Sequence, residues 1–84
     1  MTYAYVIAPE LDAFLRKLKK KDPILFQGVT KKIIQVVEQP EVYKTLVHVG
    51  GKYKRVHVGS FVLLFTIEGN TVIFLTLKHH DDAY

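Results

Sequence analysis

The chain has 84 residues and a mass of 9.7 kDa, which is enough for one domain and too little for two. Its apolar fraction of 49% excludes intrinsic disorder, and the lack of cysteine excludes disulfides, thiolate metal sites and a cysteine nucleophile. A net charge of +4 favours a negatively charged partner, either a polyanion or an acidic protein. With no signal peptide and no apolar run long enough to span a membrane, we expect a cytoplasmic protein that binds no membrane.

The first half of the chain predicts a strand and two helices. Residues 2–7 are rich in Tyr, Val and Ile, and Pro9 ends this strand. Apolar residues then recur at helical spacing up to Leu18, with acids before them and lysines after them, as the helix dipole favours. Asp22-Pro23 predicts a break and a new start, and the second helix ends before Pro40. The two helices are expected to form an antiparallel hairpin.

The second half predicts three strands. Residues 52–58, 61–67 and 71–77 are β-type runs, separated by two short turns that contain Gly59 and Gly69. The order is therefore β-α-α-β-β-β, a single domain over residues 1–84. We expect a two-layer α+β fold in which the helical hairpin packs on one face of an antiparallel sheet. Two consecutive apolar strands also imply cover on the second face, from the chain's own tail or from a partner.

A basic run in the helical region is the first candidate for a binding surface. Residues 16–32 carry seven basic side chains and one acid. The run is either a solvated helix face or a surface for phosphate groups, to which we assign Lys19, Lys20 and Lys21. Contacts of this kind position a nucleic acid but do not cut it.

The strand over residues 52–58 is the second candidate. Alternation along a strand predicts that Tyr53, Arg55 and His57 share one face, and that Lys54, Val56 and Val58 share the other. Arg55 and His57 are then about 7 Å apart, where a guanidinium can hold phosphate and an imidazole can transfer a proton. We assign phosphate binding also to Lys52, Lys54 and Lys78. An ordinary exposed strand with outward polar residues gives the same pattern.

The tail from His79 to Tyr84 combines two histidines with two aspartates. Neighbouring strand residues point to opposite faces, so His79 and His80 are poor joint ligands, and we expect neither a metal nor a cofactor. RNA cleavage by attack of its own 2′-hydroxyl needs a base, an acid and cations, and no metal. The candidate catalytic set is Arg55, His57, His80 and Tyr84.

Over nearly its whole length the sequence resembles the RelE/ParE superfamily of toxins from type II toxin–antitoxin systems, in particular the short archaeal RelE-like members. The segment 53–61 is similar to the family's YRRVRVGDY, and the segment 78–84 to its closing GHRDDVY. The opening Pro9-Glu10-Leu11 and the hairpin 68–75 follow the family in the same order.

The resemblance implies a fold, an activity and a partner. RelE-type toxins have the β-α-α-β-β-β order, and many cut mRNA in the ribosomal A site. A RelB-like acidic antitoxin holds each of them inactive, and the assembly expected here is a homodimer or a toxin–antitoxin heterotetramer. By position, Arg55 and His57 correspond to basic residues of the family's sheet motif, and Tyr84 to the closing tyrosine.

Three departures from the family pattern leave alternatives open. Val62, His80 and His57 stand where family members have arginine. If cleavage survives, the histidines move the chemistry from charge stabilisation towards acid–base catalysis. The alternatives are a non-catalytic ParE-like inhibitor, which in that branch acts on DNA gyrase, and a catalytically silent toxin.

Overall fold

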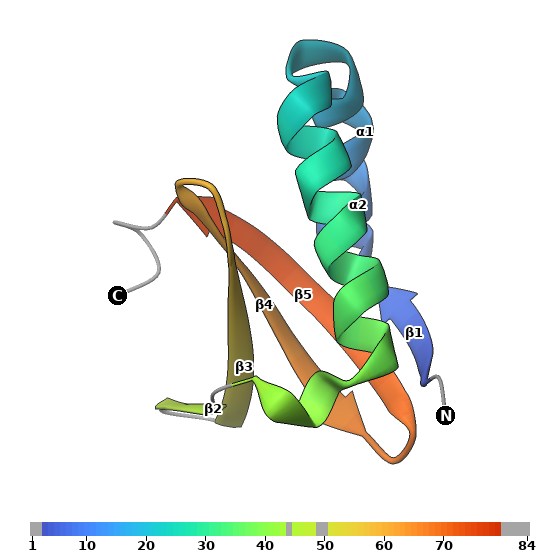
Figure 1. Cartoon of the computed structure of the whole chain (residues 1–84), viewed down its shortest axis with the longest axis vertical. Helices are drawn as coiled ribbons and strands as arrows, with labels where there is room; N and C mark the ends of the chain where they lie inside the picture. Colours follow the sequence, from blue (N-terminus) through green and yellow to red (C-terminus); the bar gives the residue numbers. More distant parts are fainter. Residues whose placement is uncertain (1–2, 44, 49–50, 80–84) are drawn as a thin grey trace.

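The computed structural model describes residues 3–43, 45–48 and 51–79 of the chain. Within these residues a five-stranded sheet has the strand order β1-β5-β4-β3-β2, and two helices lie against one of its faces (Figure 1). The elements in chain order are β1 (Ala4–Ile7), α1 (Pro9–Lys21), α2 (Pro23–Glu38), the short 3₁₀ helix η1 (Pro40–Val42), β2 (Thr45–His48), β3 (Gly51–Val58), β4 (Phe61–Glu68) and β5 (Thr71–His79).

The helical hairpin forms where its local signals predict it. Asp22 separates the helices, and its carboxylate accepts a 3.1 Å hydrogen bond from the backbone N–H of Leu25. This bond satisfies one of the free amide groups at the start of α2, while Pro23 has no amide hydrogen to satisfy. A single residue therefore ends one helix and caps the next, and the predicted hairpin is confirmed.

The core lies between the hairpin and the sheet. Its central rings, Phe65 of β4 and Phe74 of β5, are fully buried with centroids 5.8 Å apart. Gly28 brings α2 close to β3, since a Cβ at this position would lie 3.3 Å from Cγ1 of Val58. The buried cluster comprises Leu11, Leu15, Leu18, Val29, Ile33, Val36, Val37, Val56, Val58, Leu63, Phe65, Val72, Phe74 and Leu77.

The predicted two-layer α+β architecture and the three consecutive antiparallel strands are confirmed. Two details were predicted wrongly. The sheet is mixed, because β1 pairs in parallel with β5, from Ala4 opposite Thr71 to Ile7 opposite Phe74. A further strand, β2, precedes β3 and pairs with it antiparallel. It has only four residues, too few to show a periodic pattern in the sequence.

The two tight turns of the sheet depend on glycine. Gly59 and Gly69 both have φ of 60°, a backbone region that side chains with a Cβ disfavour. These turns link β3 to β4 and β4 to β5, as the sequence predicts. No helix in the described parts of the chain is long and apolar enough to cross a membrane.

Candidate functional site

The sheet face opposite the helices, hereafter the open face, carries the predicted set of residues from β3. Val56 and Val58 are buried in the core beneath the helices. By strand alternation, Tyr53, Arg55 and His57 therefore lie on the open face. The predicted division of this strand into two faces is confirmed.

Strand register brings Lys78 to the same part of the open face. Arg55 lies opposite Leu64 of β4, which lies opposite Thr76 of β5. One step along, His57 lies opposite Val62, which lies opposite Lys78. Because neighbouring strands are about 4.8 Å apart, the backbones of His57 and Lys78 are roughly 10 Å apart. We call Arg55, His57 and Lys78 the basic cluster.

The members of the basic cluster differ in exposure. The Nη1 atom of Arg55 is buried, so part of its guanidinium is shielded from solvent. His57 and Lys78 are exposed. The cluster therefore combines a partly buried guanidinium, an exposed imidazole and an exposed ammonium group. Together these groups can bind a phosphate and exchange a proton beside it.

Val62 lies at the centre of the basic cluster. Its side chain is 0% exposed even though it projects from the open face. It is outside the main core cluster, which lies on the helix-facing side of the sheet. The position at which the resemblance predicts an arginine is therefore a packing position here, and it adds no charge to the cluster.

Lys54 lies apart from the basic cluster. Its Nζ donates a 2.8 Å hydrogen bond to the backbone carbonyl of Tyr43, on the helix-facing side of β3. Lys54 therefore ties β3 to the segment that follows η1. Its assignment to phosphate binding stays a prediction, and the geometry gives it no shared surface with Arg55.

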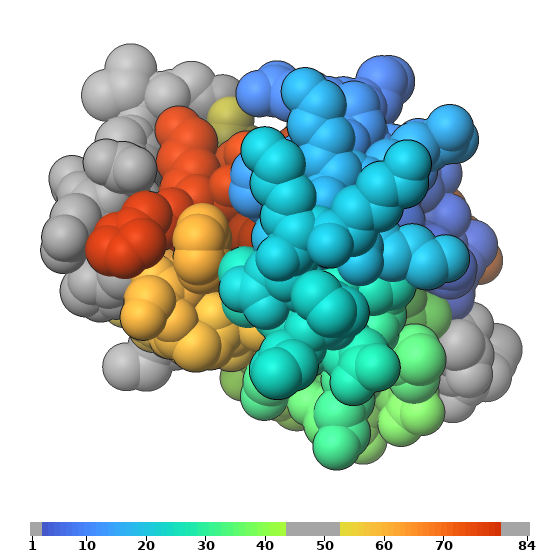
Figure 2. All heavy atoms as spheres, turned by 90° about the horizontal axis from the view of Figure 1, so that it is seen from above, coloured from blue at the N-terminus to red at the C-terminus, as the bar shows by residue number. Residues whose placement is uncertain are grey.

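The other predicted site residues lie away from the basic cluster or outside the residues that the structure describes. Lys19, Lys20 and Lys21 lie exposed at the end of α1, where the hairpin projects beyond the sheet (Figures 1 and 2). Lys19 Nζ lies 5.9 Å from the ring centroid of Phe26. The backbone of Lys52 pairs with Val47 in the sheet. His80 and Tyr84 fall outside the described residues.

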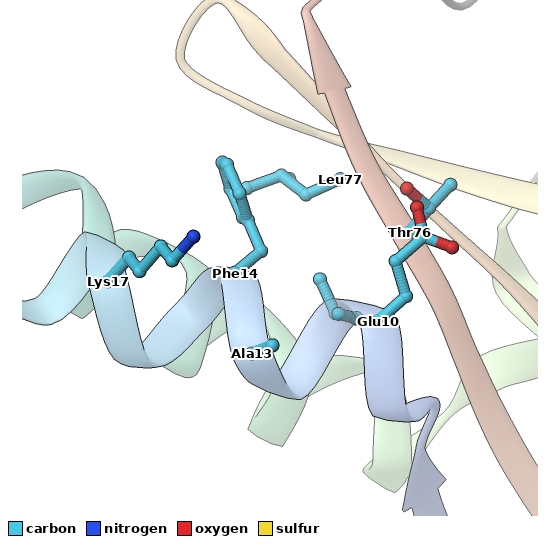
Figure 3. A pocket seen from close by; sticks show the side chains of 7 residues that line it. Glu10, Ala13, Phe14, Lys17, Thr76 and Leu77 are labelled. Carbon is cyan, nitrogen blue, oxygen red and sulfur yellow. The ribbon is translucent and has the colours of Figure 1, made fainter.

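A groove beside the basic cluster contains a residue to which sequence reasoning gave no functional role. Its volume is about 440 Å³, and it is lined by Glu10, Tyr53, Leu64, Leu75, Thr76 and Lys78, together with Ala8. We call it the Glu10 groove. Glu10 and Thr76 also line a neighbouring hollow of about 260 Å³, where the side chain of Glu10 extends from α1 towards Thr76 (Figure 3).

No function was predicted for Glu10 from the sequence, because an acid at the start of a helix is already explained by the structure of the helix. An acid in the first turn of a helix interacts favourably with the helix dipole. That signal says nothing of the strand beside which the helix begins. Among the described residues, no group of three or more His, Asp or Glu side chains could hold a metal ion.

Comparison with known proteins decides the family. The family model described as ParE toxin of type II toxin-antitoxin system, parDE, matches residues 5–84. The chain belongs to the RelE/ParE superfamily of toxins. The predicted family membership is thus confirmed, and with it the general role of a toxin of a type II toxin–antitoxin system.

Two relatives and one solved structure extend this result. A Methanocaldococcus jannaschii protein named "Putative toxin RelE4" is 42% identical over 98% of this chain and 90% of its own length. An uncharacterized protein of Methanosarcina mazei is 35% identical over 98% of this chain and 99% of its own length. A chain in the crystal structure of the archaeal RelE-RelB complex from Pyrococcus horikoshii OT3 shares the fold, with a TM-score of 0.72 and 18% identity, covering 94% of this chain and 96% of that one.

Proposed function

We propose that this toxin is a RelE-like endoribonuclease that cleaves mRNA in the ribosomal A site, with the open face as its RNA-binding surface. The observation that carries the proposal is the basic cluster. Arg55 and His57 from β3 and Lys78 from β5 share one part of one face, without help from the lysine-rich helices. The relatives with RelE-type names support this branch of the superfamily.

The proposed reaction is an internal transesterification of RNA. The 2′-hydroxyl oxygen attacks the adjacent phosphorus while the bond from phosphorus to the 5′-oxygen breaks. A base takes the proton of the 2′-hydroxyl, and an acid protonates the departing 5′-oxygen. The products are a 2′,3′-cyclic phosphate and a 5′-hydroxyl, so the step needs no further reactant.

Each residue of the basic cluster has a role in this reaction. Arg55 binds the non-bridging phosphate oxygens and stabilises the charge that builds on them. His57 is exposed, and an imidazole can both accept and donate a proton, which suits proton transfer. Lys78 adds positive charge opposite the two β3 residues. His80 and Tyr84 remain proposed proton-transfer residues on sequence grounds alone.

A translating extract with a defined mRNA tests the proposal, with cuts mapped by primer extension. We expect the wild-type toxin to cut within codons, and Arg55→Ala and His57→Ala each to slow cutting about 100-fold. His80→Ala and Tyr84→Phe are expected to slow it as well. Arg16→Ala is the matched control, because Arg16 is exposed on α1 and pairs with Asp12 at 3.1 Å. Intact mRNA in the presence of folded wild-type toxin would refute the proposal.

The buried Val62 favours one second candidate, a ParE-like inhibitor without nuclease activity. A valine with no exposed surface cannot stabilise phosphate where family members have arginine. Growth arrest with intact mRNA and damaged DNA would select this function and point to a gyrase-type target. Expression without any growth arrest would indicate a catalytically silent toxin.

We further propose that a short acidic, RelB-like antitoxin neutralises the toxin at a groove between β1 and the hairpin. This groove has a volume of about 380 Å³ and an apolar lining that includes Tyr5, Phe26 and Ile34. Tyr5 is 54% exposed and Ile34 is 62% exposed, while Arg16 and Lys19 stand at the rim. Apolar lining with cationic rims fits an amphipathic segment that carries acidic flanks.

The edge position of β1 offers backbone partners to the same segment. Ala4 and Ala8 donate their N–H groups to Asn70 and Phe74, at 3.1 and 2.8 Å, on the β5 side. In a parallel ladder the groups of the intervening residues, Tyr5 and Ile7, point to the opposite edge. An extended antitoxin strand can bond to these groups.

Co-purification with the acidic product of the neighbouring gene tests this interface. Ile34→Asp is expected to weaken the complex at least tenfold, because it places a carboxylate in the apolar groove. Ile24→Asp is the matched control, since Ile24 is 83% exposed at the start of α2 and does not line the groove. Equal binding of the antitoxin by both variants would show that it binds at a different surface of the toxin. Light scattering on the complex tests for a heterotetramer, and light scattering on the isolated toxin tests for a homodimer.

A further inference from the structure

The Glu10 groove is continuous with the basic cluster, yet its chemistry is different. Leu64, which lines the groove, is the direct cross-strand partner of Arg55. Lys78, which also lines the groove, belongs to the basic cluster itself. A molecule whose phosphate lies on Arg55 therefore extends its adjoining part over Leu64 and into the groove.

We propose that the Glu10 groove binds the base of a nucleotide next to the cleaved phosphate, with Tyr53 as the stacking ring and Glu10 as the group that reads the base. The inference rests on the proposed function, because it places the base of the same RNA. It adds a base preference that the family assignment does not supply.

The lining of the groove suits a base better than a second phosphate. Leu64 and Leu75 give it apolar lining, and Tyr53 adds a half-exposed ring. Single-stranded RNA is commonly held by stacking of its bases on aromatic side chains. The volume of about 440 Å³ is within the range of small-molecule sites, roughly 300–1,000 Å³.

The charge of Glu10 excludes phosphate and selects hydrogen-bond donors. Between the described residues the ion pair present is that of Arg16 with Asp12, and Glu10 has no cationic partner there. Its carboxylate oxygens accept hydrogen bonds only. An anionic group would be repelled at this end of the groove, whereas a base edge that carries N–H groups would be bound.

The four bases differ in how well they satisfy a carboxylate. Guanine presents two adjacent N–H donors, one on the ring and one exocyclic, which can engage both oxygens of Glu10 at once. Adenine and cytosine present one amino group beside a ring acceptor. Uracil presents one ring N–H between two carbonyl oxygens, which the carboxylate repels. The expected order of preference is guanine first, then adenine and cytosine, then uracil.

A pair of defined mRNAs tests the inference in the translating extract. The two messages differ in one base, guanine or uracil, beside a mapped cleavage position. We expect wild-type toxin to cut the guanine message at least tenfold faster. Glu10→Gln should reduce this ratio to about threefold or less while cutting of the uracil message continues. Tyr53→Leu should slow both messages and leave their ratio unchanged.

Glu38→Gln is the matched control, because Glu38 is an exposed acid at the end of α2 and lines neither groove. It should behave as wild type. A guanine-to-uracil ratio that is the same in wild type and Glu10→Gln would overturn the inference while leaving the nuclease proposal intact.

If wild-type toxin cuts neither message, the nuclease proposal fails, and nucleotide titration of the isolated toxin decides the inference separately. Guanosine 5′-monophosphate and uridine 5′-monophosphate are added to ¹⁵N-labelled protein. Larger amide shifts at Tyr53 and Thr76 with the guanosine nucleotide, lost in Glu10→Gln, would support the groove as a base site. Equal shifts with both nucleotides, or none, would overturn it.

Discussion

The hydroxyl of Tyr3 donates a 2.6 Å hydrogen bond to Oε2 of Glu41, across 38 residues of sequence. The backbone N–H of Tyr3 also bonds to the carbonyl of Val37, at 3.1 Å. These two bonds fasten the residue before β1 to the end of α2 and to η1. The start of the edge strand is thus held by the hairpin as well as by β5.

The Tyr3–Glu41 bond predicts a loss of stability at high pH. The bond requires a neutral phenol, so the hydrogen bond to Glu41 raises the pKa of Tyr3 above 10.0. Because the pKa is higher in the folded state than in the unfolded chain, the contribution is fully present below pH 10 and is lost as pH rises through the raised pKa. NMR titration should show Tyr3 ionising later than the unperturbed value.

Two variants isolate this effect. Tyr3→Phe should remove the part of the pH dependence of unfolding that lies above pH 10. Glu41→Ala should return the pKa of Tyr3 towards its ordinary value, because it removes the hydrogen-bond acceptor that is the main cause of the raised pKa. A Tyr3 that titrates at or below the ordinary tyrosine pKa in wild type would contradict the structural explanation.

Val62→Arg is expected to destabilise the fold by about 2 kcal/mol or more, although it restores the residue that the family pattern favours. Val62 is fully buried, so a guanidinium there must either lose its hydration or displace the groups that cover the position. Urea unfolding measures the cost. Val62→Ala, which loses volume without adding charge, is the comparison. An unfolding free energy equal to wild type would show that this position readily opens to solvent.

Lys54→Met is expected to lower the unfolding free energy by about 1–2 kcal/mol, because the carbonyl of Tyr43 loses its charged donor. Lys31→Met, an exposed change on α2, should cost much less. Cleavage by folded Lys54→Met tests the predicted phosphate binding separately, and a rate equal to that of wild type would contradict it. A tenfold lower rate at unchanged folded fraction would instead support the prediction that Lys54 binds phosphate.

Asp22→Ala is expected to destabilise the toxin by about 1 kcal/mol, since the amide of Leu25 loses its acceptor at the start of α2. Thermal unfolding followed by circular dichroism measures the change. Asp22→Asn keeps a side-chain acceptor and should recover most of the loss. Failure of asparagine to do so would assign the effect to the charge of Asp22 instead of its hydrogen bond.

The parts of the fold that the sequence predicts are those set by neighbours along the chain. Asp22-Pro23 is enough to divide the hairpin, and Gly59 and Gly69 mark both turns of the antiparallel strands. The partner of β1 is different, because its pairing with residues 71–74 depends on how the whole hairpin packs. No local pattern distinguishes a parallel from an antiparallel neighbour for a four-residue strand.

The candidate site also has parts that the sequence predicts and parts that only the three-dimensional structure shows. Alternation along β3 correctly places Arg55 and His57 on one face, because a strand has a fixed period of two. The cross-strand positions of Lys78 and Leu64 require the register of β5 and β4, which the sequence does not encode locally. The contribution of Glu10 requires the packing of α1 beside β5, and it could be seen only in three dimensions.

The strand order also controls when the toxin can acquire its shape during its own synthesis. β5 lies between β1 and β4, and it is the last of the described strands to be translated. Until about residue 79 has left the ribosome, β1 has no neighbour, Phe65 lacks Phe74, and the basic cluster lacks Lys78. Long-range pairing of this kind delays cooperative folding until it can close. The described sheet therefore cannot close, and the basic cluster cannot form, until its last strand has been synthesised.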